Sequence, residues 1–211
     1  MGSYIFKLCE NLTTVDCPKC TTISPNAFYS CSKLTSINFP ACTAIASYAF
    51  ISCRSLTSIN FFNCATVGSY AFEFCSNLSL ASLPACTVIS SGAFMLCSKL
   101  SAIYLAGSSV CKLQHSNAFS STKITSTTGS IYVPLSLGWS YKNATNWTYF
   151  FNRIFSIEGE EIVEPPISFT IDGIAYEATI DSTWSDWVRS DYNTAGFKIN
   201  GAAIVSADGS V

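Results

Sequence analysis

The stretch "LTSINFPACTAIASYAFISCRS" (34–55) is followed at once by "LTSINFFNCATVGSYAFEFCSN" (56–77), and the two match position by position. The same 22-residue step recurs through much of the 211-residue chain. Three residue types mark it: cysteines at 9, 31, 53, 75 and 97 and at 20, 42, 64 and 86, phenylalanines at 6, 28, 50, 72 and 94, and leucines at 12, 34, 56, 78 and 100. A fixed period in this range predicts a solenoid in which each repeat forms one coil.

The alternation inside one repeat predicts which side chains face the core. In "LTSINF" (34–39), Leu34, Ile37 and Phe39 should point inward, while Asn38 faces out, so each repeat contributes one short strand to a parallel sheet. We expect "SYAFISC" (47–53) to turn back as a short helix or 3₁₀ turn, with Ala49, Phe50 and Cys53 inward. No repeat can bury its core alone, so the coils depend on their neighbours and on capped ends.

The repeat reads L-x-x-I-x-F-x-x-C-x-x-I and then A-F-x-x-C. Its first part resembles the leucine-rich repeat core, with one extra residue between the cysteine and the next aliphatic residue. The second part, as in "IASYAFISCRSL" (45–56) and "VGSYAFEFCSNL" (67–78), resembles the BspA-like leucine-rich repeat family of bacteria and some protists. The resemblance covers about residues 1–157. It implies an α/β-type repeat solenoid, with a parallel sheet on one face and short helices or 3₁₀ turns on the other.

The ends of the array differ from its middle. Cys111 and Phe119 follow their columns only after a three-residue insertion, and we expect a C-terminal cap over about 112–157. Its aromatic side chains, expected to close the last coil, are Trp139, Tyr141, Trp147, Tyr149, Phe150 and Phe151. At the other end, "MGSYIFKLC" (1–9) aligns with the middle of a repeat. We therefore expect a fragment of a longer array, the alternative being a gene that begins abruptly.

The period is lost after the acidic, proline-ended segment "EGEEIVEPP" (158–166), which we interpret as a linker. Residues 167–211 are predicted to form a small α+β module with the order β-β-α-β-β. Alternating runs around Asp172 and Gly173 favour a hairpin, and "STWSDWVRS" (182–190) favours a helix. This module resembles one appended to surface and phage-associated proteins of gut Firmicutes.

"CPKC" (17–20) looks like half of a zinc site or a redox-active pair. One period later, however, Cys17 aligns with Phe39, and Cys20 belongs to a cysteine column. Free cysteine behaves as a small, well-buried hydrophobic residue. We therefore expect all eleven cysteines to be core thiols and expect no metal at this pair.

Little in the composition favours catalysis. A Ser-His-Asp or Cys-His arrangement would have to use the single histidine, His115, which lies in the irregular insertion unit. With one histidine and core cysteines, the chain offers no zinc ligand set. We expect no cofactor and no enzyme activity. A net charge of −2 gives no case for nucleic acid, and the longest apolar-looking run (147–155) is too short to cross a bilayer.

The outward positions of the sheet are polar and almost uncharged. The candidate ligand-contact face is the column that gains aromatic residues towards the cap: Asn38, Asn60, Ser82, Tyr104 and Tyr132. Hydroxyl, amide and aromatic side chains together suit a protein or carbohydrate ligand. The sequence thus favours a non-catalytic binding or adhesion module. We expect the full-length protein to lie on a bacterial cell surface or to be secreted. The alternatives are a structural or host-recognition part of a phage particle, with a virion location, and a passive spacer.

Overall fold

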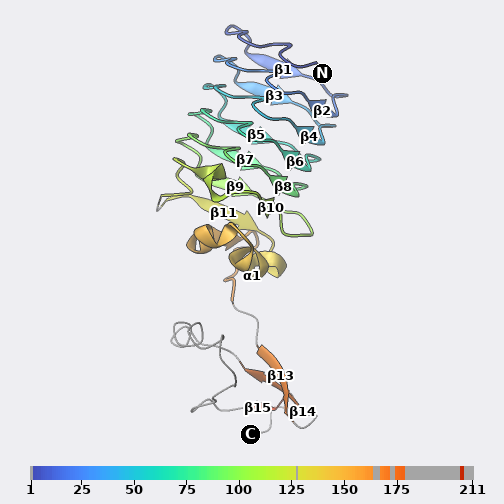
Figure 1. Cartoon of the computed structure of the whole chain (residues 1–211), viewed down its shortest axis with the longest axis vertical. Coiled ribbons are helices and arrows are strands. Elements are labelled where there is room, and N and C mark those ends of the chain that lie inside the picture. Colours follow the sequence, from blue (N-terminus) through green and yellow to red (C-terminus); the bar gives the residue numbers. More distant parts are fainter. Residues whose placement is uncertain (1, 127, 164–166, 172–173, 179–204, 207–211) are drawn as a thin grey trace. The chain divides into compact units, whose positions relative to one another are not determined.

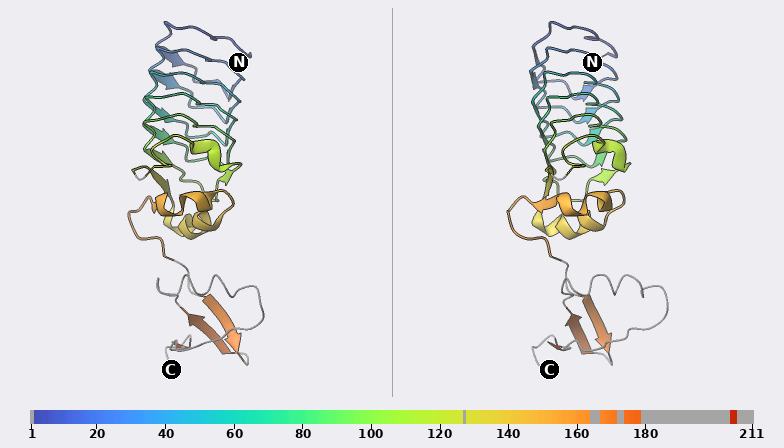
Figure 2. Two further views of the ribbon diagram at one scale, coloured as in Figure 1. Left: turned by 60° about the vertical axis from the view of Figure 1, so that its left-hand side comes forward. Right: turned by 90° about the vertical axis from the view of Figure 1, so that its left-hand side faces the viewer.

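The computed structural model describes residues 2–126, 128–163, 167–171, 174–178 and 205–206, the last three ranges by their backbone alone. The chain divides into two compact units, Met1–Ile162 and Val163–Val211. The first unit contains the repeats and the cap, and its coils stack as parallel rungs (Figures 1 and 2). The solenoid predicted from the 22-residue period is confirmed.

The first ladder consists of short parallel strands, which were predicted from "SINF" and its equivalents except for the last one, at 154–156. They are β1 (Thr14–Asp16), β3 (Ser36–Asn38), β5 (Ser58–Asn60), β7 (Leu80–Ser82), β9 (Ala102–Tyr104), β11 (Ser130–Val133) and β12 (Ile154–Ser156). Strands β1 and β3 form one sheet, and the other five form a second sheet in the order β12-β11-β9-β7-β5. The register follows the period, so Ser82 of β7 faces Tyr104 of β9.

A second ladder was not expected. It consists of two-residue parallel strands in the order β10-β8-β6-β4-β2: β2 (Thr22–Ile23), β4 (Ala44–Ile45), β6 (Thr66–Val67), β8 (Val88–Ile89) and β10 (Lys112–Leu113). The segment after each strand, such as 47–52, is a run of turns and not a helix. Tyr48 and Ser52 have φ of 62° and 60°. Two left-handed residues four apart interrupt any helix, so the regular repeats turn here. Among the repeats that the structure describes, only the irregular one has a 3₁₀ helix at this place, η1 (Ser116–Phe119).

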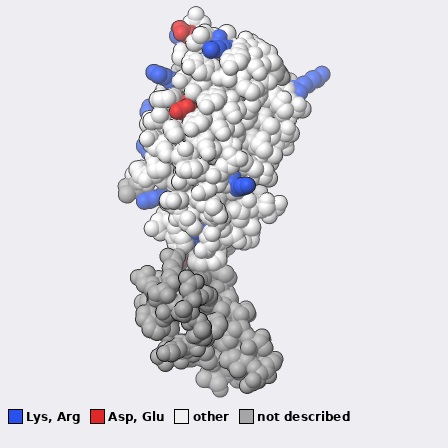
Figure 3. Space-filling model, in the orientation of Figure 1, with Lys and Arg blue, Asp and Glu red and all other residues white. Residues whose placement is uncertain are grey.

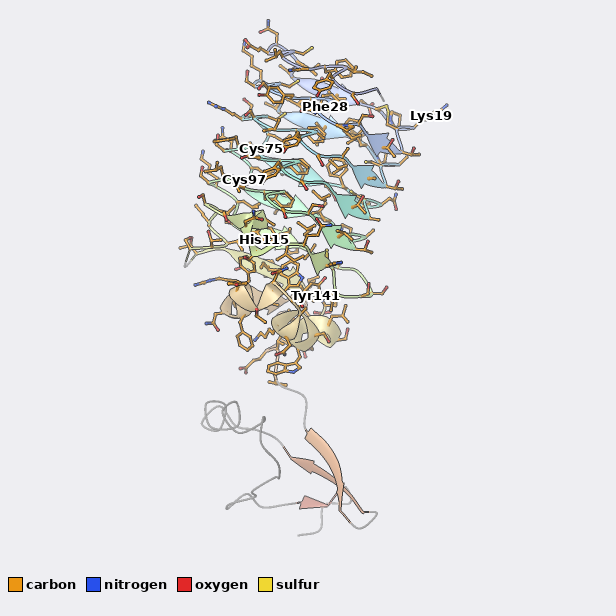
Figure 4. The ribbon with its side chains drawn as sticks, viewed as in Figure 1. Lys19, Phe28, Cys75, Cys97, His115 and Tyr141 are labelled. Atoms are coloured by element: carbon orange, nitrogen blue, oxygen red, sulfur yellow. A yellow bond between two sulfur atoms is a disulfide. The ribbon has the colours of Figure 1, made fainter. Side chains whose placement is uncertain are left out.

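The core is built from columns of identical side chains. Phe28, Phe50 and Phe72 are fully buried and stack with ring centroids 5.0 and 5.2 Å apart, nearly parallel. Each buried cysteine beside them donates its thiol to a carbonyl of the preceding coil: the Sγ of Cys53 lies 3.1 Å from Phe28 O, and that of Cys97 lies 3.0 Å from Phe72 O. Figure 4 shows the labelled Cys75 and Cys97 one coil apart. Cysteine therefore recurs because it fills the core and also satisfies a buried carbonyl.

The expectation of eleven core thiols is wrong at "CPKC". Cys17 and Cys20 form a disulfide, while the other nine cysteines are free. The amide of Cys20 donates to Cys17 O at 3.2 Å, so this turn brings the two Cα atoms within 5.5 Å, which is disulfide range. Both residues are only half-buried, and Lys19 between them projects from the edge of the solenoid (Figure 4). The later coils carry phenylalanine or leucine at the position of Cys17, so they lack the second sulfur.

The cap consists of α1 (Leu135–Asn143) and the 3₁₀ segment η2 (Trp147–Arg153). Tyr141 and Trp147 are fully buried, and both bind the backbone of Cys111: its amide donates to Tyr141 Oη at 2.8 Å, and Trp147 Nε1 donates to its carbonyl at 2.6 Å. Burial raises the pKa of Tyr141. Tyr149, expected in the cap core, is instead 75% exposed.

In the second unit, β13 (Ile167–Ile171) and β14 (Ile174–Ala178) pair antiparallel around positions 172–173, as the predicted hairpin requires. Strand β15 (Val205–Ser206) pairs antiparallel with β14. The helix expected at 182–190 lies outside the described residues.

Candidate functional site

The register of the first ladder brings four of the five predicted contact residues together. Asn60, Ser82, Tyr104 and Tyr132 occupy equivalent positions on β5, β7, β9 and β11. In each strand the residue before them points inward, which turns these four side chains outward. Asn38 lies on the separate two-stranded sheet, where its Nδ2 donates to Asp16 Oδ1 at 3.0 Å.

The column continues into a residue that the sequence did not single out. Phe155 on β12 is in register with Tyr132 and is 44% exposed. The ring centroids of Tyr104 and Tyr132 lie 4.6 Å apart at an interplanar angle of 12°, and those of Tyr132 and Phe155 lie 6.3 Å apart at 41°. We call Tyr104, Tyr132 and Phe155 the aromatic strip. The alternation in "RIFSI" (153–157), with Ile154 and Ser156 buried, was the signal that could have identified this last strand.

A pocket of about 230 Å³ lies at the end of the aromatic strip. Tyr132 and Phe155 line it together with Ser130, Ser156, Gly159 and Glu160. The pocket wall is held by Glu158, whose Oε2 accepts hydrogen bonds from Ser156 Oγ at 2.7 Å and from Leu135 N, the first residue of α1, at 2.9 Å. These hydrogen bonds lower the pKa of the Glu158 carboxyl, and the bond from Ser156 has the largest effect.

Elsewhere on the solenoid surface, many repeated hydroxyls bond between coils. Thr35 Oγ1 donates to Thr13 O at 3.1 Å, and Ser79 Oγ donates to Thr57 O at 3.0 Å. On the second ladder, Thr87 Oγ1 donates to Ala65 O at 3.0 Å in the same way. These hydroxyls serve the stacking of the coils, so their abundance alone does not indicate a ligand. The aromatic strip is different because large rings occupy positions where the earlier coils carry asparagine or serine.

The described residues offer little for catalysis or metal binding. They include no group of three or more histidine, cysteine or acidic side chains close enough to hold a metal ion. His115 Nδ1 accepts a hydrogen bond from Asn117 N at 3.0 Å, which makes it the N-cap of η1. Charged side chains are sparse on the face of the repeat unit shown in Figure 3. A ligand in the pocket beside the aromatic strip would meet the rings of Tyr132 and Phe155, the serine hydroxyls and the carboxylate of Glu160.

The sequence profile of the BspA type leucine rich repeat region matches residues 1–125 in six copies. The chain belongs to the BspA-type leucine-rich repeat family. The match ends between β10 and β11, so the aromatic strip of this BspA-type protein straddles the end of the matched repeats: Tyr104 lies inside them, and Tyr132 and Phe155 lie beyond them.

Two solved structures are similar to this BspA-type chain. One is the leucine rich repeat protein of T. pallidum, at 30% identity and a TM-score of 0.48, over 49% of this chain and 50% of that one. The other is a leucine rich cell surface protein from Faecalibacterium prausnitzii, at 22% identity and a TM-score of 0.35, over 79% of this chain and 46% of that one. This chain spans about half the length of each. A comparison with curated proteins found no match. In the part of the chain that the structure describes, no helix is long and apolar enough to cross a membrane.

Proposed function

We propose that the chain is a non-catalytic binding module that contacts a protein or carbohydrate ligand through the aromatic strip and its pocket. The observation that carries the proposal is the in-register column of Tyr104, Tyr132 and Phe155 beside a cavity of about 230 Å³. Aromatic side chains provide large contact areas at low cost in conformational entropy, and they are enriched among residues that dominate binding energy.

The surrounding fold supports such a role. Strands β9, β11 and β12 are hydrogen-bonded neighbours in one sheet, so the strip is fixed before any ligand arrives. A preorganised surface reduces the ordering cost of binding. Because the three rings of the strip carry no charge, we expect binding through them to depend only weakly on salt. Placement on a bacterial cell surface, or secretion, belongs to the same proposal and rests on membership of the BspA-type family.

A passive spacer is the second candidate function. The inter-coil hydrogen bonds of Thr35, Ser79 and Thr87 favour it, because they show that a hydroxyl-rich surface can arise from stacking alone. Nothing in the described residues or the comparisons favours a part of a phage particle.

Arrays of glycans and of host extracellular proteins, probed with the purified chain, separate the two candidates. The test variants are Tyr104→Ala and Phe155→Ala, and the matched control is Ser58→Ala, an exposed residue of β5 outside the strip. Loss of a hot-spot aromatic should weaken binding at least about tenfold. The proposal fails if no ligand binds, which leaves the spacer, or if every ligand survives both test variants unchanged, which places binding outside the aromatic strip.

A further inference from the structure

A second and larger pocket lies on the cap, outside the aromatic strip. It has a volume of about 520 Å³ and opens between the η1 region, with the turns that follow it, and η2. We call it the cap pocket and define it by Asn117, Ser120, Ile124, Tyr149, Phe150 and Asn152. Its volume falls within the range of roughly 300–1,000 Å³ that is typical of small-molecule sites.

The apolar residues of the cap pocket are buried at its floor and exposed at its rim. Ile124 and Phe150 are buried, and Phe150 packs edge-on against Phe119 with ring centroids 5.4 Å apart. Tyr149 at the rim is 75% exposed, the most exposed large hydrophobic residue among those described. A single exposed aromatic residue is ordinary on a protein surface. Its position at the rim of a concave site is what makes a ring face useful to a ligand.

The polar part of the cap pocket offers hydrogen-bonding groups that the fold leaves unused. Asn117 Oδ1 accepts from Gly92 N at 3.1 Å, which fixes the amide and leaves its Nδ2 for a ligand. Within the described residues, the Ser120 hydroxyl and the Asn152 side-chain amide have no hydrogen-bond partner, and both line the pocket. Hydroxyl and amide groups each donate and accept, so the pocket matches a ligand whose groups do the same.

An exposed aromatic ring next to side chains that both donate and accept hydrogen bonds favours a carbohydrate ligand. Vicinal sugar hydroxyls both donate and accept, and the C–H face of a pyranose ring packs on an aromatic ring. A peptide that binds by adding a strand would need an open strand edge, which the turns and 3₁₀ segments around the pocket do not present. The lining includes no acidic residue and one basic residue, Arg153, so it lacks the basic surface that nucleic acid requires.

We propose that the cap pocket binds the terminal sugar residues of an oligosaccharide, with Tyr149 as the stacking platform and Asn117, Ser120 and Asn152 as hydrogen-bonding partners. This site is separate from the aromatic strip and does not depend on it.

The test is an array of neutral and acidic oligosaccharides with short peptides as a parallel arm, followed by calorimetric titration of the best hit. Tyr149→Ala and Asn152→Ala are the test variants, because both side chains are exposed and should leave the fold intact. Phe62→Ala is the matched control, since Phe62 is a 62% exposed aromatic residue outside the pocket. We expect Tyr149→Ala to weaken sugar binding at least about tenfold, with Phe62→Ala unchanged.

Three results would overturn the proposal: no oligosaccharide binds, only peptides bind, or sugar affinity survives both Tyr149→Ala and Asn152→Ala. Unfolding temperatures of the variants check that they are folded. A sugar hit that Phe155→Ala abolishes and Tyr149→Ala leaves intact belongs to the aromatic strip and also counts against the cap pocket.

Discussion

The middle coils of the solenoid and its C-terminal end use similar side chains for different purposes. In the coils of residues 34–77, phenylalanines stack on phenylalanines in the core, and hydroxyls donate to carbonyls of the preceding coil. At the C-terminal end, Tyr104, Tyr132 and Phe155 form an aromatic column on the surface, and two pockets open beside cap residues. The difference teaches that the regular coils keep asparagine and serine on the outward column of the first ladder, while the C-terminal end places three neighbouring rings on that same column.

The largest effect should come from the middle of the core. Phe50→Ala removes a fully buried ring stacked between Phe28 and Phe72, and the cavity should cost roughly 3–5 kcal/mol of unfolding free energy. Chemical denaturation of wild type and variant measures it. Asn38→Ala on the exposed column is the control, and its loss should be much smaller. Equal losses would mean that the inward and outward columns are assigned wrongly.

The next effect tests how the cap is attached. Trp147→Phe removes the Nε1 donor to Cys111 O and leaves a buried carbonyl without that partner, which should cost about 1–3 kcal/mol. Tyr149→Phe, two residues away on the exposed rim, should change the unfolding free energy by less than about 0.5 kcal/mol. If the two variants unfold at the same denaturant concentration, the bond to Cys111 does not hold the cap in place.

The first coil contains the Cys17–Cys20 disulfide, whereas the cysteines of the other coils are free. The loop that the disulfide closes is very short, so reducing Cys17–Cys20 should cost no more than about 2 kcal/mol in the chain-entropy account. Thermal unfolding with and without a phosphine reductant measures the loss. The double variant Cys17→Ala/Cys20→Ala should be insensitive to the reductant. A reductant effect that persists in this variant would show that another cysteine pair is oxidised.

The smallest effect concerns pH and the pocket wall. Hydrogen bonds from Ser156 and Leu135 lower the pKa of Glu158, so its contribution to stability is present above the unfolded pKa of about 4.3 and is lost as pH falls through the lower folded pKa. Acidification should therefore release the 156–160 loop from α1. Amide resonances of Leu135 and Glu158 report this, and Glu158→Gln should not show the same titration. Leu135 and Glu158 amides that do not respond below pH 4 in the wild type would contradict the assignment.

Much of the repeat region was predictable because the period fixes it. Once Phe28, Phe50 and Phe72 recur every 22 residues, parallel in-register stacking follows, and the alternation around Ile59 decides which side chains face inward. The candidate column from Asn60 to Tyr132 was readable for the same reason. Its role in binding stays a prediction.

The remaining features depended on contacts that no period encodes. The disulfide formed because a turn brings Cys17 to Cys20, and the segment expected as a short helix or 3₁₀ turn is a run of turns in which Tyr48 and Ser52 adopt left-handed backbone angles. The sequence by itself determined the coil, its core columns and the outward polar face, since these repeat with the chain. Only the tertiary structure decided where Phe155 extends the strip and where Tyr149 meets Asn117 across the cap pocket, because residues far apart in an irregular stretch come together there through packing alone.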